Sequence, residues 1–312
     1  MLTRNLVSDK PPIISLLLIV GNVLLGSFLG MLLGQAIASS FYEYDLSSIL
    51  KEETLDPSIL KPMMIIQGCG TLVGLILFPI IELKIIERKS ISNFFPSQEK
   101  TGLMLLLIAF LGVTFILAMS PLTEWNMNWE FPDALKHLEA MARESEEAAA
   151  KLTRVMTNFG SVEELLMGLI VIAVLPAIGE ELVFRGLIQN EFFRGTGRIH
   201  ISIWASAFIF SAIHFQFFGF VPRLLLGALF GYLYFWSGNL LVPIFAHFFN
   251  NAFSVIMYYL YAEKITDLNP DDNTAIAPGF VLVHLVLTLG LLYYIRNHYQ
   301  KARRNSTADF YE

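Results

Sequence analysis

Long apolar runs constrain what this chain can fold into more than any other feature of its sequence. A helix needs about 20 apolar residues to cross roughly 30 Å of hydrocarbon. Backbone groups inside lipid must bond to one another, so such spans are expected to be helical. The candidate spans are about Pro12–Ser39, Met63–Ile86, Gly102–Pro121, Glu164–Phe193, His200–Phe218, Val221–Trp236, Leu240–Tyr261 and Gly279–Ile295. The sequence therefore predicts an all-α, polytopic transmembrane bundle of about eight membrane helices.

The composition agrees with a membrane protein. Of the 312 residues, 55% are hydrophobic and 15% are charged, whereas soluble domains are usually about 45–50% apolar and about 25% charged. The net charge is −6 and no basic stripe is present, which is not typical of nucleic-acid binders. We therefore expect the lipid bilayer, and no nucleic acid, among the partners. Cys69 is the single cysteine, so an internal disulfide is impossible.

Two parts of this pattern allow a second interpretation. The first span follows Arg4 and Lys10, and the small residues Ala36–Ser40 resemble a signal-peptide cleavage site. The span is longer than the roughly 7–15 apolar residues of a signal core, so we interpret it as a retained helix. The fifth and sixth spans are short and are separated only by the stretch FGFVPR. We expect two crossings there, with a re-entrant pair as the alternative.

The distribution of basic residues predicts the orientation. An even number of crossings puts both termini on one side, and the loops of that side carry twelve Lys and Arg residues against eight on the other. By the positive-inside rule that side is cytoplasmic. We expect a multi-pass protein of the cell membrane, a single integral membrane domain over 1–312 with both termini in the cytoplasm.

The long loop over 122–161 contains a polar helix. Residues 130–157 are rich in Ala, Glu and Lys, which are good helix formers. Leu135, Leu138 and Ala142 begin an apolar stripe at helical spacing. We predict an extramembrane helix that rests on the bundle or at the interface, and the alternative is a cover over a functional site.

Three charges stand close together in the fourth span. Glu180, Glu181 and Arg185 lie where an ionised side chain costs about 2.5–3.5 kcal/mol. Glu181 and Arg185 are four residues apart, so they share a helix face and can pair. Glu180 lies about 100° round the helix and lacks that partner. A pair alone would suit a cross-link within the bundle, but an unpaired carboxylate in a membrane helix indicates a functional site.

Two later spans add imidazole and amide groups. His214 stands alone in an apolar stretch, and His247 and Asn251 lie four residues apart on one face of the seventh span. A lone histidine in an apolar helix is more often a structural, hydrogen-bonded residue. Two histidines in separate membrane helices, with an asparagine in register, favour a site instead.

The expected depths of these residues agree. Glu180 and His214 each lie seventeen residues from Gly197, at the turn between their helices. His247 lies eight residues past the turn at Asn239, which is roughly 12 Å along a helix. We therefore expect Glu180, His214 and His247 to converge in one layer on the cytoplasmic side of the membrane midplane, with Asn251 one turn further in.

This set of groups suits hydrolysis by an activated water. The sequence has neither a G-x-S-x-G motif nor an HExxH motif. Glu180, together with His214, can act as the general base. His247 and Asn251 can donate hydrogen bonds to the oxyanion. We favour a site without cofactor or metal; the alternative is a zinc ion held by Glu180, His214 and His247 with an open water position.

The three motifs together resemble a known family. EELVFR (Glu180–Arg185), FSAIH (Phe210–His214) and HFFNN (His247–Asn251) fit the patterns EExxxR, FxxxH and HxxxN on successive spans. In this order they resemble the type 2 CAAX prenyl protease and bacteriocin-processing family of intramembrane glutamic endopeptidases, the CPBP or Abi family. The resemblance covers about Glu163–Tyr261, within a catalytic core over 160–262.

That resemblance implies a fold and an activity. The fold would have eight helices and a cytoplasm-facing site, in which Glu180 activates water. The surrounding residues would be Glu181, Arg185, Phe210, His214, His247 and Asn251. The expected activity is hydrolysis of a peptide bond in CAAX-type or in peptide and membrane-protein processing. The expected partner is a peptide or membrane-anchored protein, with or without a lipid group.

Two other functions use similar residues. A non-catalytic scaffold or bacteriocin-immunity-type protein would keep the site only to bind a peptide. A proton-coupled transporter would use buried Glu and His as a proton relay, although the sequence shows no internal repeat of the kind that transporters have. A Glu180→Gln variant separates the peptidase from the scaffold.

Overall fold

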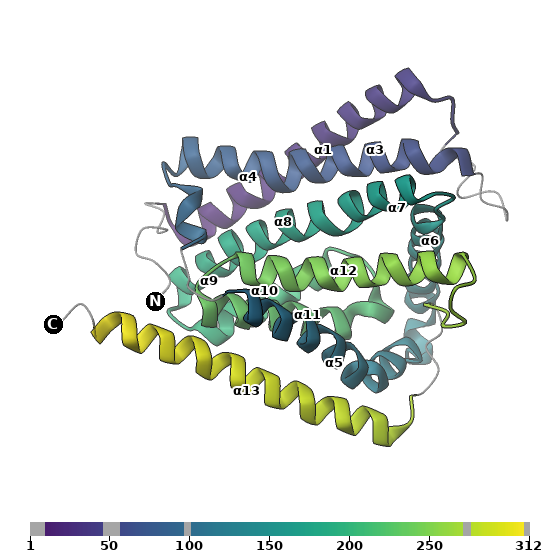
Figure 1. The fold of residues 1–312 in the computed structure, drawn as a ribbon. Coiled ribbons are helices and arrows are strands. Elements are labelled where there is room, and N and C mark those ends of the chain that lie inside the picture. Colours follow the sequence, from purple (N-terminus) through teal and green to yellow (C-terminus); the bar gives the residue numbers. More distant parts are fainter. Residues whose placement is uncertain (1–9, 46–56, 97–100, 271–275, 309–312) are drawn as a thin grey trace.

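The structure is a computed structural model that describes residues 10–45, 57–96, 101–270 and 276–308. These residues form helices and no strands. Seven helices are long and apolar enough to cross a membrane, so the predicted all-α membrane bundle is confirmed (Figure 1). Three basic residues counted for the orientation, Arg4, Lys51 and Lys100, lie outside the described residues.

Most spans end close to the predicted positions. The single helices are α1 (Pro12–Phe41), α5 (Thr101–Met127), α11 (Phe220–Ser237), α12 (Leu241–Ala262) and α13 (Pro278–Ala308). The second span is continuous from η2 (Pro57–Ile59) through α3 (Leu60–Thr71), η3 (Leu72–Leu77) and α4 (Phe78–Ile81) to η4 (Glu82–Ile86). A 3₁₀ turn, η5 (Ile91–Phe94), follows it. α13 runs well past the predicted end at Ile295, because the polar residues after the apolar run are also good helix formers.

The fifth predicted span is wrong in length. We expected His200–Phe218, but α10 covers Ile199–Ala212. At 1.5 Å per residue this helix is about 21 Å long, which is short of the hydrocarbon thickness. The chain breaks at Phe215, whose φ of 53° lies in the left-handed region that a non-glycine residue rarely adopts. A 3₁₀ turn, η9 (Phe217–Gly219), then leads into α11, against which α10 packs.

The fourth span is a composite helix over Val162–Thr196. It consists of α7 (Val162–Gly168), the π-helical η7 (Leu169–Val174), α8 (Leu175–Glu181), the π-helical η8 (Leu182–Ile188) and α9 (Gln189–Thr196). π-Helical turns inside α-helices are rare and are frequent at functional sites. Glu180 and Glu181 end the α-helical piece between the two π-helical stretches.

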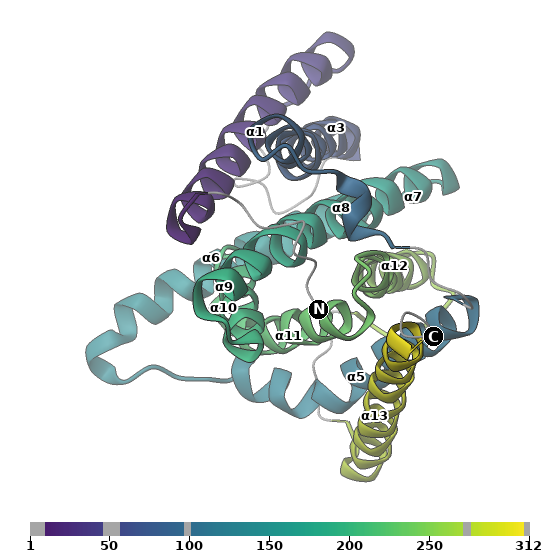
Figure 2. The ribbon, with the colours of Figure 1, turned by 90° about the vertical axis from the view of Figure 1, so that its left-hand side faces the viewer.

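This composite helix lies near the middle of the bundle. One side contacts the second span, on which α1 packs, and the other contacts α12. α12 in turn packs on α5 and α11, and α13 packs on α5 at the periphery (Figure 2). The described buried side chains form clusters between these helices, such as the one around Phe184, Phe210 and Tyr234. The residues of the candidate site therefore stand at the centre of the molecule.

The two ends of the bundle differ. The start of α1 and the end of α13 lie at one end of the bundle, on the left in Figure 1. The predicted loop helix is present as α6 (Lys136–Thr157), preceded by the 3₁₀ turn η6 (Asp133–Leu135), and lies across the other end. Its predicted stripe is only partly buried, because Leu135 and Leu138 are exposed while Met156 is buried.

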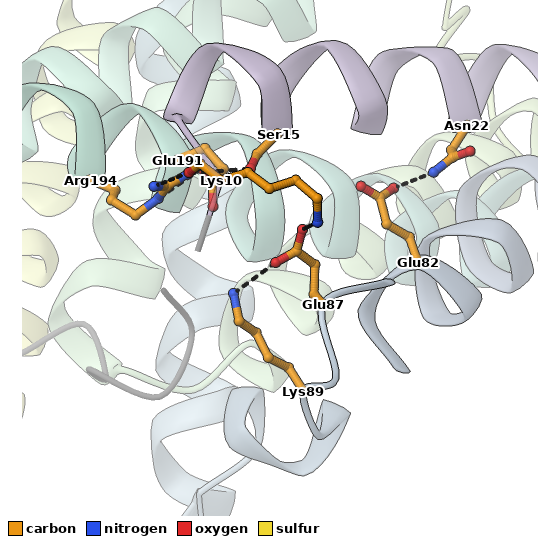
Figure 3. Close-up of polar contacts among 8 residues, drawn as sticks. All are labelled: Lys10, Ser15, Asn22, Glu82, Glu87, Lys89, Glu191 and Arg194. Atoms are coloured by element: carbon orange, nitrogen blue, oxygen red, sulfur yellow. Dashed lines mark hydrogen bonds and ion pairs between the residues drawn. The ribbon is translucent and has the colours of Figure 1, made fainter. Parts of the chain in front are cut away.

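A charged cluster fastens the end of the bundle where α1 begins (Figure 3). Lys10 and Lys89 both pair with Glu87, at 2.8 and 3.5 Å. Arg194 of α9 pairs with Glu191 and donates to the carbonyl oxygen of Lys10 at 2.6 Å. Burial lowers the pKa of the Lys89 amine. The cluster links α1, the end of the second span and α9, which suits a structural role.

Candidate active site

The predicted pair between Glu181 and Arg185 is confirmed. Arg185 Nη1 donates to Glu181 Oε1 at 2.7 Å, and the two side chains are 1% and 0% exposed. Arg185 Nη2 donates to the carbonyl oxygen of Gly227 in α11 at 2.8 Å. The guanidinium also lies 4.8 Å from the centre of the Phe210 ring and 5.4 Å from that of Phe230. Arg185 thus neutralises Glu181 and joins the composite helix to α10 and α11.

His247 lies between the two glutamates. Its Nδ1 is 2.8 Å from Glu181 Oε1, and its Nε2 is 3.8 Å from Glu180 Oε2. An ionised carboxylate can only accept, so the contact with Glu181 requires a proton on Nδ1. The neutral imidazole then carries its lone pair on Nε2, on the side of Glu180. Stacking on Phe230, with ring centres 5.1 Å apart, fixes the plane of the ring.

Glu180 has a different environment from Glu181. Its side chain is 17% exposed, against 0% for Glu181. Among the residues that the structure describes, none donates a hydrogen bond to its carboxylate, and His247 Nε2 at 3.8 Å is the one basic group within ion-pair distance. A gap of that size leaves the carboxylate able to bind a water molecule. Two adjacent carboxylates therefore differ as the sequence predicts, one held in a hydrogen-bonded ion pair with arginine and one that accepts no hydrogen bond from the described residues.

His214 joins the site through Phe210. It follows the end of α10, and its Nδ1 lies 2.7 Å from the carbonyl oxygen of Phe210. A carbonyl oxygen only accepts, so the proton is on Nδ1 and the lone pair of the neutral ring is on Nε2. The Phe210 ring centre is 5.2 Å from that of His214 and 6.0 Å from that of His247. The structure thus brings Glu180 and His247 together directly, and both His247 and His214 contact the Phe210 ring.

The side-chain amide of Asn251 already makes two hydrogen bonds within the protein. Its Nδ2 donates to the carbonyl oxygen of Ile172 at 3.2 Å, and its Oδ1 accepts from Asn250 Nδ2 at 3.2 Å. Ile172 lies in the π-helical η7, which packs on α12. An amide nitrogen has two hydrogens, so one of them remains for a substrate oxygen.

α6 holds the segment that follows His214. Ser145 Oγ donates to the carbonyl oxygen of Phe215 at 3.0 Å. Glu146 accepts from the Phe218 N–H at 3.3 Å and from Gln216 Nε2 at 3.4 Å. Burial raises the pKa of the Glu146 carboxyl, and the bond from Phe218 offsets part of that increase. α6 therefore contacts the border of the candidate site.

Arg223 is the main residue near the site that the sequence pattern does not indicate. It interacts electrostatically with Glu180 and with Glu146. In the sequence it stands in the apparent turn FGFVPR and is counted only as a loop cation. The one signal is a single cation at the start of an otherwise apolar helix, where α11 begins at Phe220.

The alternative metal site is not assembled in the described part of the chain. No group of three His, Cys, Asp or Glu side chains there is placed to hold a metal ion. Of the proposed ligands, His247 Nε2 lies 3.8 Å from Glu180 Oε2, and His214 contacts the Phe210 ring.

Comparison with known proteins supports the motif assignment. Residues 162–253 match the family model described as type II CAAX prenyl endopeptidase Rce1-like. This is the CPBP family, so the resemblance predicted from the three motifs, all of which lie in the segment, is confirmed. Uncharacterized protein YpbD of Bacillus subtilis (strain 168) is 35% identical over 88 residues, which are 27% of this chain and 42% of YpbD. The match thus spans less than half of that relative. No solved structure matches the chain.

Proposed function

From the Rce1-like family match of residues 162–253, we propose that this integral membrane protein is an endopeptidase that uses a water molecule activated by Glu180. The observation that supports this most is that Glu180 and Glu181 have different hydrogen-bond partners. Glu181 is engaged by Arg185 and His247, whereas Glu180 has no direct hydrogen-bond partner in the described residues. Adjacent carboxylates in different environments take different roles in catalysis.

The geometry suggests the following reaction. Glu180 removes a proton from water, and the water oxygen attacks the carbonyl carbon of the scissile peptide. The carbonyl π-electrons move to the oxygen, which becomes an oxyanion. The proton on Glu180 passes to the peptide nitrogen, the C–N bond breaks, and an acid and an amine are released. Water is the only co-reactant.

Three groups are proposed to assist Glu180. Asn251 has one amide hydrogen left to donate to the oxyanion. His247 has Nδ1 on Glu181, so it can donate from Nε2 to the oxyanion only when both ring nitrogens carry a proton. His214 has its Nε2 available to orient the water or the substrate, since its Nδ1 is taken by Phe210.

The proposed substrate is a peptide or membrane-anchored protein, in CAAX-type or other processing. We propose that the protein lies in the cell membrane with both termini in the cytoplasm, on the basis of its basic loops. A scaffold that binds the same substrate without cleaving it is the alternative function.

Comparison of protein termini in membranes tests the proposal. Cells with the wild type and cells with His247→Ala are compared by proteomics of the membrane fraction. We expect at least one precursor or uncut C-terminus to accumulate in the variant, because the variant loses the Nε2 group that faces Glu180. His284→Ala is the control, since His284 bonds a carbonyl four residues earlier, as His214 does, but on the peripheral α13. Identical termini in all three, at equal protein levels, would contradict a peptidase.

Removal of metal tests the proposed absence of a cofactor. With the substrate so identified, 1,10-phenanthroline or EDTA is expected to change the cleavage rate by less than about twofold, because in the proposed reaction Glu180 supplies the base and Asn251 and His247 the oxyanion donors. Abolition by the chelator and recovery with zinc would instead support the ligand set of Glu180, His214 and His247.

A further inference from the structure

The turn that carries His214 has an unfavourable backbone conformation. α10 ends at Ala212, and His214 lies two residues beyond that end. Phe215 follows with a φ of 53°, in the left-handed region that phenylalanine rarely adopts. Its side chain is 81% exposed, so packing of the ring does not impose this conformation. Such a conformation persists only where the surrounding structure holds it.

The helix α6 supplies contacts that hold this turn. Ser145 Oγ donates to the carbonyl oxygen of Phe215 at 3.0 Å. Glu146 Oε2 accepts from the Phe218 N–H at 3.3 Å, and Glu146 Oε1 accepts from Gln216 Nε2 at 3.4 Å. Two neighbouring side chains of one helix therefore bind three of the four residues that follow the histidine.

The same turn is fastened to two further helices. Gln216 Oε1 accepts from Arg223 Nη2 of α11 at 2.7 Å, while its Nε2 is bonded to Glu146. Asn126 of α5 donates to the carbonyl oxygen of Phe217 at 3.3 Å. α6 therefore holds the part of the turn nearest to the histidine, and α5 holds the part where η9 begins.

We propose that Ser145 and Glu146 are positioning residues of the candidate site, which hold the turn after His214 in its left-handed conformation and so fix the place of the imidazole. This inference rests on the proposed peptidase function and deepens it. α6 precedes the family-matched segment 162–253, so the functional unit would include a helix outside that segment. The cost of misplacing a group that assists the reaction is large, about 10²-fold for 1 Å.

Substitutions on α6 test the effect on the reaction. Glu146→Ala is expected to lower the rate of cleavage of the substrate identified above by about 10- to 100-fold. Ser145→Ala is expected to have a smaller effect, because it removes one hydrogen bond rather than two. Glu147→Ala is the control, since Glu147 is the next carboxylate of α6 and is exposed. A wild-type rate in folded Glu146→Ala, or an equal loss in Glu147→Ala, would overturn the proposal.

A substitution of Phe215 separates positioning from a general structural role. Asparagine adopts the left-handed backbone more readily than phenylalanine, so Phe215→Asn makes the turn less dependent on α6. The loss of rate caused by Glu146→Ala should be at least about threefold smaller in the Phe215→Asn background than in the wild-type background. The comparison cancels any effect of Phe215→Asn by itself. An equal loss in both backgrounds would contradict the proposal, because the α6 contacts would then not act through the turn.

Hydrogen exchange tests the hold of α6 on the turn without a substrate. In the full-length protein in detergent micelles, amides 213–218 are expected to exchange about tenfold faster in Glu146→Ala than in the wild type or in Glu147→Ala, because the Phe218 N–H loses its acceptor. If Glu146→Ala does not fold, Ser145→Ala decides by the same measurements. Unchanged exchange would overturn this inference. Faster exchange in a protein whose wild type cleaves no peptide would support the hold of α6 on the turn and contradict only the proposed function.

Discussion

Replacement of Glu180 by Gln is expected to lower the rate of peptide cleavage by about 10²- to 10⁴-fold, the usual contribution of a general base. Glutamine has nearly the same shape but cannot take a proton from water. The rate is measured with the purified full-length protein and the substrate that accumulates in His247→Ala cells. Glu163→Gln is the control, because Glu163 is an exposed carboxylate in the first turn of the same composite helix.

The stability of the Glu180 variant is as informative as its activity. The wild-type carboxylate accepts no hydrogen bond from the described residues, and its nearest basic group is 3.8 Å away. The variant should therefore unfold at nearly the same temperature as the wild type. Full activity of Glu180→Gln at a normal protein level would contradict the peptidase and favour the scaffold.

The residues of the candidate site stand out in the sequence because they break a simple rule. An ionisable or amide group in a long apolar run is costly, so Glu180, Glu181, Arg185, His247 and Asn251 stand out in the sequence. The pair Glu181–Arg185 follows from their spacing alone, and the structure confirms it.

Local backbone geometry could not be predicted in the same way. The π-helical stretches η7 and η8 arise inside an apolar helix whose sequence gives no periodic sign of them. Asn251 donates to the carbonyl oxygen of Ile172 in η7, a contact between two helices that the spacing of residues along the seventh span does not indicate. The early end of α10 depends on the left-handed backbone of Phe215, a conformation that sequence does not favour for phenylalanine.

Contacts between distant segments account for the remaining differences. Arg223 donates a hydrogen bond to Gln216, and Gln216 donates one to Glu146. Glu146 lies on α6, 70 residues before Gln216 in the chain. A polar loop helix and a cation in an apparent turn are separately unremarkable in sequence. Only the contacts of α6 with the segment that follows His214 indicate that α6 contributes to the border of the candidate site.

Removal of Arg185 is expected to cost about 3–5 kcal/mol of folding free energy, as for other buried pairs that lose one partner. Arg185→Met would keep most of the side-chain volume but leave the fully buried Glu181 without its counter-ion and the Gly227 carbonyl without its donor. Equilibrium unfolding in detergent micelles measures the loss. Arg198→Met, at an exposed position, should stay within about 0.5 kcal/mol of the wild type.

A second substitution separates the charge from the packing of Arg185. In the double variant Glu181→Gln with Arg185→Met, no unpaired carboxylate is left, so part of the stability lost in Arg185→Met should return. The Glu181→Gln change would also withdraw the charge beside His247, so cleavage should stay impaired even where stability recovers. If Arg185→Met is as stable as the wild type, the pair does not hold the bundle together. Its contacts with His247 and Phe210 would then serve the charge balance of the site alone.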